Sequence, residues 1–181
     1  MGSNPEPVAA GNAKNRPRFD SLMAKESQSA SATHATQYVT FRLAEETYAI
    51  NVMQVQEVLR VAEIAPVPGA PHYVLGIINL RGNVVTVIDA RRRMGLMDKE
   101  SDDSSRVVII EVTGQVIGIL VDSVAEVIEL AEKDVDPAPN VGNDESSKYI
   151  QGVASREGEL TIVVDLNKLL TDDEWAEVAS L

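Results

Sequence analysis

An internal repeat is the feature of this sequence that most restricts its fold. Residues 48–61 align without a gap on residues 117–130, and both segments share a Val-x-Glu-Val core. Residues 73–89 align in the same way on residues 149–165, and both segments end in aspartate. Two ungapped matches in the same order indicate a duplicated unit, so we expect two similar subdomains.

Each copy reads as a series of short β-strands. The first predicted strand, residues 38–43, alternates polar and apolar side chains, and Glu45 and Glu46 mark a turn before the next strand. Val, Ile and Leu are abundant, whereas the chain has two Phe and one Trp, which indicates an aliphatic, β-branched core. The further runs with strand character are 76–80, 84–88, 107–112, 116–121, 149–154 and 160–164. Short, numerous strands are typical of small barrels.

The repeat also predicts the domain boundaries. We expect a first barrel at about residues 37–103, a second barrel at about 104–165 and a C-terminal helical segment at about 166–181. Asp89 and Asp165 each follow a strand and are interpreted as N-caps of short helices. In the C-terminal segment, Thr171 and Glu174 have the spacing of a capping box before Trp175, Val178 and Leu181, which recur along one helical face.

Residues 1–36 differ in composition from the rest of the chain. They are rich in Ser, Ala, Asn, Gly, Pro and Thr and contain few apolar side chains, which predicts a disordered tail. An alternative is a short binding helix that carries Phe19, Leu22 and Met23 at helical spacing. The net charge of the whole chain is −12. Because the tail carries +1, residues 37–181 carry −13.

Charge and residue usage exclude several classes of function. The strongly acidic body argues against binding to nucleic acid or to anionic membrane surfaces. The chain has no cysteine and its two histidines are isolated, so we expect no metal site, no cofactor and no disulfide. No apolar run approaches the roughly 20 residues that span a bilayer, and no secretory signal pattern begins the chain, so we expect a cytoplasmic protein. We find no catalytic motif and predict that the protein is not an enzyme.

The two copies differ at one hairpin tip. Arg81 precedes Gly82 in the first copy, whereas Glu157 precedes Gly158 in the second. A glycine alone satisfies the turn, so a reversed side-chain charge indicates that the two surfaces have different uses. Arg81 is either a solvated turn residue or an anchor for a partner's carboxylate or carbonyl. The run 91–93 of three arginines is interpreted as a solvated helix face.

Several blocks of the sequence resemble the CheW family of chemotaxis coupling proteins. They are YAINVMQVQEVL at residues 48–59, GIINLRG at 76–82, VIDAR at 87–91 and GILVD at 118–122. The resemblance spans about residues 37–170. It implies an all-β fold of two packed five-stranded SH3-like barrels with short helices and a C-terminal helix. It also implies a non-catalytic adaptor that is monomeric when free.

The partners implied by this resemblance are chemoreceptor tips and the regulatory domain of the histidine kinase CheA. The adaptor is then recruited from the cytoplasm to membrane-associated receptor arrays, without inserting into the membrane. The residues implied for the receptor-binding groove are Val55, Glu57, Arg81, Val107 and Val108. For any one of these valines, the alternative is a place in the barrel core, because alternate strand residues must point inward.

The candidate kinase-binding surface is a proline-stiffened loop, residues 62–71, which resembles the part of the CheW family that meets the kinase's regulatory domain. Its prolines restrict the backbone, so Ile64 and Val67 lose little entropy when they bind a partner. The alternative is that the loop packs over the first barrel. A rival function of another class is a small-ligand-binding β-barrel, although units of about 60 residues leave little room for a ligand once their cores are filled.

Overall fold

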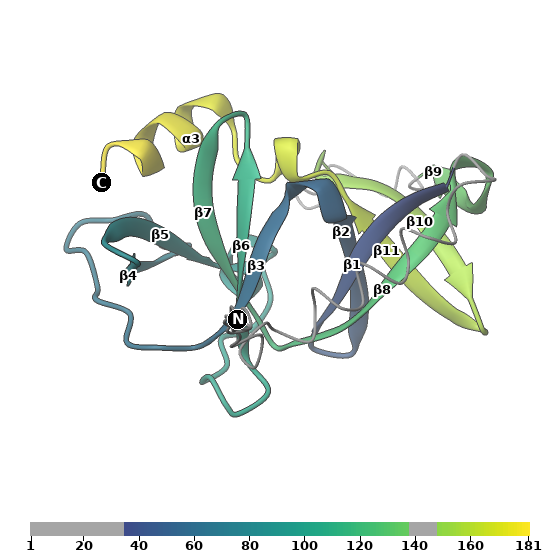
Figure 1. Ribbon diagram of the computed structural model, residues 1–181, viewed down its shortest axis with the longest axis horizontal. Helices are drawn as coiled ribbons and strands as arrows, with labels where there is room; N and C mark the ends of the chain where they lie inside the picture. Colours follow the sequence, from purple (N-terminus) through teal and green to yellow (C-terminus); the bar gives the residue numbers. More distant parts are fainter. Residues whose placement is uncertain (1–34, 138–147) are drawn as a thin grey trace, which may run out of the picture.

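The computed structural model describes residues 35–137 and 148–181 of the chain (Figure 1). The strands are β1 (Ala35–Leu43), β2 (Glu46–Asn51), β3 (Val55–Arg60), β4 (Val74–Leu80), β5 (Asn83–Asp89), β6 (Arg106–Val112), β7 (Gln115–Val121), β8 (Ser123–Ala131), β9 (Val135–Pro137), β10 (Ile150–Arg156) and β11 (Glu159–Val164). The helical elements are η3 (Val52–Gln54), α2 (Ala90–Arg93), η4 (Glu132–Asp134), η6 (Leu166–Lys168) and α3 (Asp172–Ala179). Ala35 and Thr36, which were expected in the tail, pair with β8 as part of β1. The rest of the predicted tail lies outside the described residues.

The strands form two sheets that lie side by side (Figure 1). One sheet has five strands in the order β3-β6-β7-β5-β4, and the other has six in the order β8-β1-β2-β11-β10-β9. We call them the five-stranded barrel and the six-stranded barrel. The predicted all-β class with two packed barrels is confirmed. The three-residue edge strand β9 makes the second sheet larger than predicted.

The barrels are not consecutive segments of the chain, which differs from the predicted division near residue 103. The five-stranded barrel takes β3–β5 from the first repeat and β6–β7 from the second, and the six-stranded barrel takes the remaining strands. Only Asp122 separates β7 from β8, and only one helical turn separates β2 from β3. Since a hairpin needs about two turn residues, β8 cannot fold back on β7 and continues into the other sheet.

The strand registers repeat between the two barrels. Val87 of β5 lies opposite Gly118 of β7, and the aligned residue Val163 of β11 lies opposite Ala49 of β2. Both of these pairings are parallel. Because the alignment of the sequence copies predicts the same partners in both sheets, the duplication is a structural repeat.

A shared core joins the two barrels. The largest buried cluster combines side chains of β1 in the six-stranded barrel, such as Phe41, with side chains of β6 in the five-stranded barrel, such as Ile110. Two smaller clusters fill the interiors, one around Ala154 and Val163 and the other around Val87 and Ile109. Burial of a common apolar core makes the two barrels one unit.

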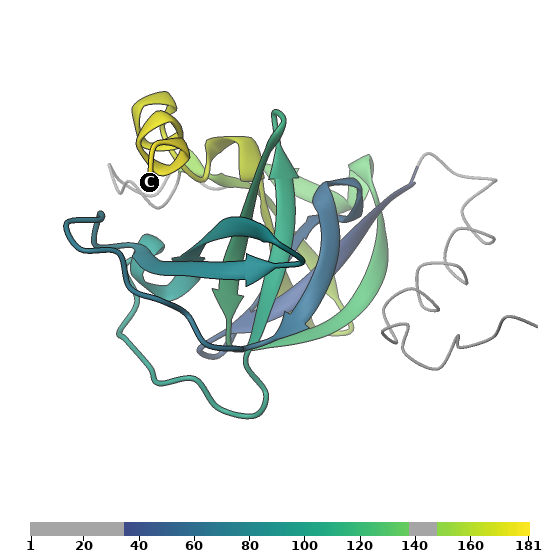
Figure 2. The ribbon, with the colours of Figure 1, turned by 60° about the vertical axis from the view of Figure 1, so that its left-hand side comes forward.

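The predicted caps are present. The Asp89 side chain accepts a hydrogen bond from the Arg91 N–H, and Asp165 accepts one from the Asn167 N–H, at 2.9 and 3.0 Å. Thr171 and Glu174 form the reciprocal capping box of α3. Val178 of this helix packs into the shared core. Figures 1 and 2 show α3 on the side of the five-stranded barrel. The predicted C-terminal helix is therefore confirmed.

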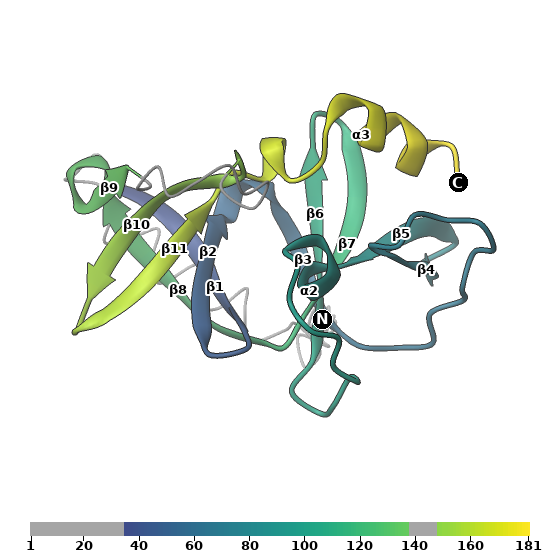
Figure 3. The same ribbon diagram turned by 180° about the vertical axis from the view of Figure 1, so that it is seen from behind.

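The arginines of α2 are not the solvated face that the sequence suggested. Arg91 donates through Nε and Nη2 to Asp122 at 2.8 and 2.5 Å, and the two side chains are only 13% and 16% exposed. Arg93 donates to the Leu169 carbonyl at 2.6 Å and to Glu174. Figure 3 shows α2 at the joint between the barrels, where these bonds connect elements of both.

Candidate functional site

A β-bulge gives Glu57 its position. The register between β3 and β6 shifts between Val55 and Glu57, where an additional residue enters β3. Such a bulge re-aims the side chains around it. Because β3 is an edge strand of the five-stranded barrel, Glu57 lies at the margin of the sheet.

The turn between β4 and β5 holds Arg81 at its tip. Arg81 and Gly82 have φ values of 53° and 85°, the pattern of a type I′ turn. The Asn79 side chain accepts a hydrogen bond from the Gly82 N–H at 2.8 Å and fixes the turn further. In Figure 2 the β4–β5 turn points toward β3.

Arg81 of the β4–β5 turn and Glu57 of β3 form a bidentate ion pair. Nη1 and Nη2 of Arg81 donate to the two oxygens of Glu57 at 2.8 and 2.9 Å. The hydrogen bonds to Glu57 raise the pKa of Arg81 above its ordinary value. The Arg81 side chain is 73% exposed and that of Glu57 is 19% exposed, so the carboxylate is partly covered while the guanidinium faces solvent. We call this feature the Arg81 tip.

The other three candidates for the groove lie in the cores. Val55, Val107 and Val108 are only 8%, 1% and 0% exposed. Val107 belongs to the interior of the five-stranded barrel, and Val55 and Val108 belong to the shared core, as the alternation of strand residues requires. These side chains offer little accessible surface to a partner. The structure therefore joins Glu57 and Arg81 at the surface, whereas the three valines lie nearby in β3 and β6 but point into the cores.

Two valines that were not predicted for the site keep part of their surface. Val58 of β3 and Val124 of β8 are half-buried against the shared core. The signal for Val124 was present in the repeat, since the alignment places it on Val55. Nearby on β3, Gln56 donates a hydrogen bond to Glu111 at 2.7 Å.

The proline-rich loop is bound to the five-stranded barrel through its backbone. Ala65 and Ile77 exchange two hydrogen bonds of 2.9 and 2.8 Å. Ile64 and Val67 are half-buried. Their exposure lies between that expected for a loop that projects into solvent and that expected for a loop packed over the barrel. Ile64 lines an open pocket of about 460 Å³, which we call the Ile64 pocket, together with Leu75, Leu120, Asp89, Arg92, Asp98, Lys99, Glu100 and Ser101.

Gly76 lets the loop approach this closely. Its φ is 155°, and a Cβ at this position would lie 2.1 Å from the Ala65 carbonyl oxygen. We expect Gly76→Ala to break both Ala65–Ile77 hydrogen bonds and to cost about 1–2 kcal/mol of unfolding free energy, within the range for overpacking. Amide hydrogen exchange at Ile77 and chemical denaturation measure the two effects. Gly82→Ala is the control, because a Cβ at Gly82 would meet no atom within 4 Å. Unchanged hydrogen exchange at Ile77 in Gly76→Ala would contradict the role given to Gly76.

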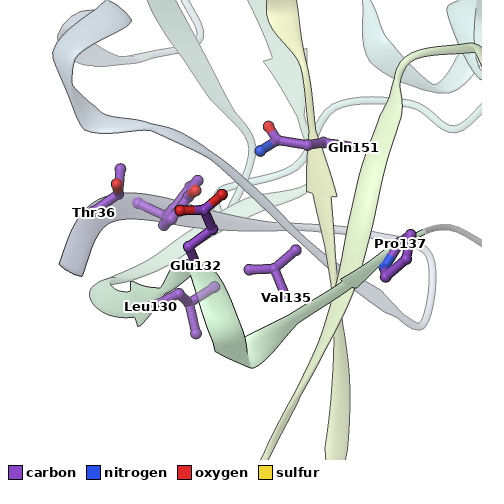
Figure 4. A pocket seen from close by; sticks show the side chains of 7 residues that line it. Thr36, Leu130, Glu132, Val135, Pro137 and Gln151 are labelled. Carbon is purple, nitrogen blue, oxygen red and sulfur yellow. The ribbon is translucent and has the colours of Figure 1, made fainter. Parts of the chain in front are cut away.

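Figure 4 shows a second pocket, in the six-stranded barrel. Its volume is about 400 Å³. The side chains that line it are Thr36, Tyr38, Leu130, Glu132, Val135, Pro137 and Gln151. In the repeat, Gln151 aligns on Leu75. Both pockets open at the surface, and packed side chains fill the interiors of the barrels.

In residues 35–137 and 148–181, no three His, Asp or Glu side chains are grouped so that they could hold a metal ion. None of the helices described is long and apolar enough to cross a membrane.

Comparison with known proteins agrees with the resemblance seen in the sequence. Residues 37–174 match the model of a family described as the CheW-like domain. The chain belongs to the CheW family. The chemotaxis protein CheW of Treponema pallidum (strain Nichols) is 37% identical over 149 residues, which cover 80% of this chain and 88% of the relative. CheW of Rhizobium meliloti (strain 1021) is 31% identical over 136 residues, which cover 75% of this chain and 88% of the relative.

A solved structure gives the same result for the fold. The scaffolding protein TtCheW from Thermoanaerobacter tengcongensis superposes with a TM-score of 0.71 at 34% sequence identity. The match covers 77% of this chain and 95% of TtCheW. The CheW fold is thus shared over nearly the whole relative, and this chain is a chemotaxis coupling protein of that family.

Proposed function

We propose that this chain is a non-catalytic adaptor that couples chemoreceptors to the histidine kinase CheA. The observation that carries the proposal is the Arg81 tip, in which a partly covered carboxylate holds an exposed guanidinium in one orientation. A pre-oriented charged group loses little entropy when a partner binds. Family membership supports a role in chemotaxis, and adaptor function requires no cofactor.

On the receptor side, we propose that a helical hairpin at the receptor tip docks beside Arg81. Arg81 offers further N–H donors to carboxylate or carbonyl groups of the receptor, since Glu57 occupies only two of its five. The half-buried Val58 and Val124 are the candidates for apolar contact, and they replace the buried valines in the proposal. Charged groups at such a contact fix register more than they add affinity.

On the kinase side, we propose that the regulatory domain of CheA meets the loop around Ile64 and Val67. The Ile64 pocket supports this proposal because it combines the apolar side chains of Ile64, Leu75 and Leu120 with a charged rim. Interfaces of this kind have an apolar centre surrounded by polar groups.

Replacing both loop residues tests the kinase side. We expect Ile64→Asp with Val67→Asp to weaken kinase binding by at least about fivefold, the effect of losing an apolar anchor, and to leave receptor binding nearly unchanged. Titration calorimetry with the CheA regulatory domain and with a receptor signalling fragment measures the two affinities. Circular dichroism serves as the folding control. Equal losses for both partners in a folded variant would remove this surface from the proposal.

The adaptor proposal predicts that one chain binds both partners at once. We expect the chain, the CheA regulatory domain and a receptor signalling fragment to elute together in size-exclusion chromatography, and the free chain to elute as a monomer. Mutually exclusive binding would refute the adaptor role. In the cell we expect a cytoplasmic protein that is recruited to membrane-associated receptor arrays, as in the family.

A further inference from the structure

The pocket in Figure 4 reaches the apolar interior of the six-stranded barrel. Two of the residues that line it, Tyr38 and Leu130, belong to the buried cluster that fills this barrel, and Val135 packs against that cluster. The pocket therefore has an apolar floor that continues into the core. Its volume of about 400 Å³ lies at the lower end of the range for small organic ligands, about 300–1,000 Å³, and gives room for one aromatic and one aliphatic side chain.

The rim of this pocket is acidic. Glu132 lines the pocket, and Asp134 and Asp136 follow at exposed positions, with Lys133 as the one cation of the segment 132–136. Glu132 forms no ion pair with any residue of 35–137 or 148–181. A carboxylate rim around an apolar floor suits an occupant that carries both apolar and cationic side chains.

The N-terminal tail joins the folded part of the chain at this pocket. The described structure begins at Ala35, the first residue of β1, and the next residue, Thr36, lines the pocket. Figure 4 shows Thr36 at the end of its strand, on the rim. Residues 1–34 therefore precede the strand at the edge of the pocket itself.

One segment of the tail matches the pocket in its chemistry. Residues 14–25 hold four Lys or Arg residues and one Asp, which gives a net charge of +3. The same segment contains Phe19, Leu22 and Met23, which are among the few large apolar residues of the tail. The segment thus has the cationic and the apolar side chains that the rim and the floor can take, and the opposite charges attract it to the rim.

The connection between this segment and β1 is long enough for docking within one chain. Eleven residues, 24–34, separate Met23 from β1. An extended chain of this length spans about 36 Å, and the pocket begins two residues beyond it. A tethered segment meets its site at an effective concentration in the millimolar range, so weak contacts are sufficient to hold it there.

We propose that the pocket of the six-stranded barrel is the docking site of the chain's own N-terminal tail. Phe19 and Leu22 occupy the apolar floor, and the cations of residues 14–25 pair with the rim around Glu132. Of the two expectations for the tail, this proposal takes up the binding segment. The pocket lies in the other barrel from the Arg81 tip and the Ile64 pocket, so the proposal stands independently of the proposed function.

A nitroxide spin label on the tail tests the docking. The chain has no cysteine, so Ala24→Cys in the full chain provides a single point of attachment. We expect paramagnetic broadening of the amide signals of Leu130, Val135 and Gln151, and none at Leu75 in the five-stranded barrel, at any protein concentration. Broadening spread evenly over both barrels would overturn the proposal. Broadening seen only between labelled and unlabelled chains would also overturn it, because the tail would then dock on a second copy.

Variants separate docking from the proximity that the tether alone provides. In the spin-labelled chain, Phe19→Ser with Leu22→Ser should lower the relaxation enhancement at Leu130 and Val135 by at least about fivefold, the effect of losing apolar anchors. Val8→Ser is the matched control, since it removes an apolar side chain of the tail outside residues 14–25. An enhancement that is equal in the anchor variant and in the control would mean that the segment does not dock.

The contribution of charge is tested on the rim. We expect Glu132→Lys to lower the same enhancement by about two- to fivefold, the range for an exposed ion pair. Glu45→Lys is the matched control, because Glu45 is exposed in the turn that follows the far end of β1. Equal losses in the two variants would show that the general field of the protein attracts the tail, and would overturn docking at this rim.

Discussion

Replacing Asp122 with alanine is expected to lower the free energy of unfolding by about 1–3 kcal/mol, the range for leaving hydrogen-bonded groups without their charged partner, because the Arg91–Asp122 pair is half-buried. The variant leaves Arg91 without its carboxylate and the Ala44 N–H without the acceptor that it reaches at 2.8 Å. Both partners lie where the two barrels meet, so the loss affects the joint. Urea denaturation followed by circular dichroism measures the change.

The internal repeat supplies a control for this variant. Met53 aligns on Asp122 but is 86% exposed, so Met53→Ala should change stability by less than about 0.5 kcal/mol. A loss for Asp122→Ala as small as that of the control would show that the Arg91–Asp122 pair does not stabilise the joint.

The same carboxylate predicts how stability depends on pH. Burial alone would raise the pKa of Asp122, but the hydrogen bonds from Arg91 and the Ala44 N–H outweigh it and lower the pKa. A folded-state pKa below the unfolded value of about 3.9 gives stability that is present above that pH and lost as the pH falls through the folded-state pKa. Denaturation between pH 2 and 6 should show this loss in the natural chain, and Asp122→Asn should flatten it.

Replacing Arg81 with glutamate is expected to weaken receptor binding by about 1–3 kcal/mol, or about 5- to 150-fold, the range for a charged anchor. The variant removes the guanidinium and places a second carboxylate beside Glu57. The fold should persist, because the equivalent hairpin has Glu157 at nearly the same φ. Calorimetric titration with a receptor signalling fragment measures the affinity.

Charge alone must be separated from the geometry of the tip. Arg60→Glu makes the same change of net charge at an exposed residue of β3 and should leave the affinity nearly unchanged. Kinase binding is expected to stay the same in both variants. If Arg81→Glu and Arg60→Glu weakened receptor binding equally, the long-range field of the protein, and not the Arg81 tip, would account for the effect.

The sequence predicted the content of the fold better than its connections. Hydrophobic alternation and the repeat identified the duplicated unit and every strand except β9, and residue spacing identified the capping box at Thr171. They did not predict that each barrel combines strands from both sequence copies. The two copies would align in the same way if each copy formed its own barrel, so the alignment cannot distinguish the two arrangements. The single residue between β7 and β8 was the available signal that strands from both copies combine.

For the candidate site, the sequence pointed to Glu57 and Arg81 as separate residues but not to their ion pair, and it placed the apolar surface on valines that the structure buries. Glu57 and Arg81 were both predicted, and the structure joins them through the bulge in β3. Val107 and Val108 cannot be separated from core residues by sequence, since a strand covered on both faces shows no polar alternation. Arg91 is an error in the other direction, since the sequence predicted a solvated side chain and the structure covers it. Its ion pair is with Asp122, which is distant in sequence.

The central claim is that this chain transmits a receptor's state to the kinase. The most direct measurement is the autophosphorylation rate of CheA reconstituted with receptor signalling fragments, with and without this chain. The account predicts that receptor fragments change the rate only when the chain is present, and that Arg81→Glu reduces this change. Equal kinase rates with and without the chain, at concentrations where all three proteins are folded, would contradict the account.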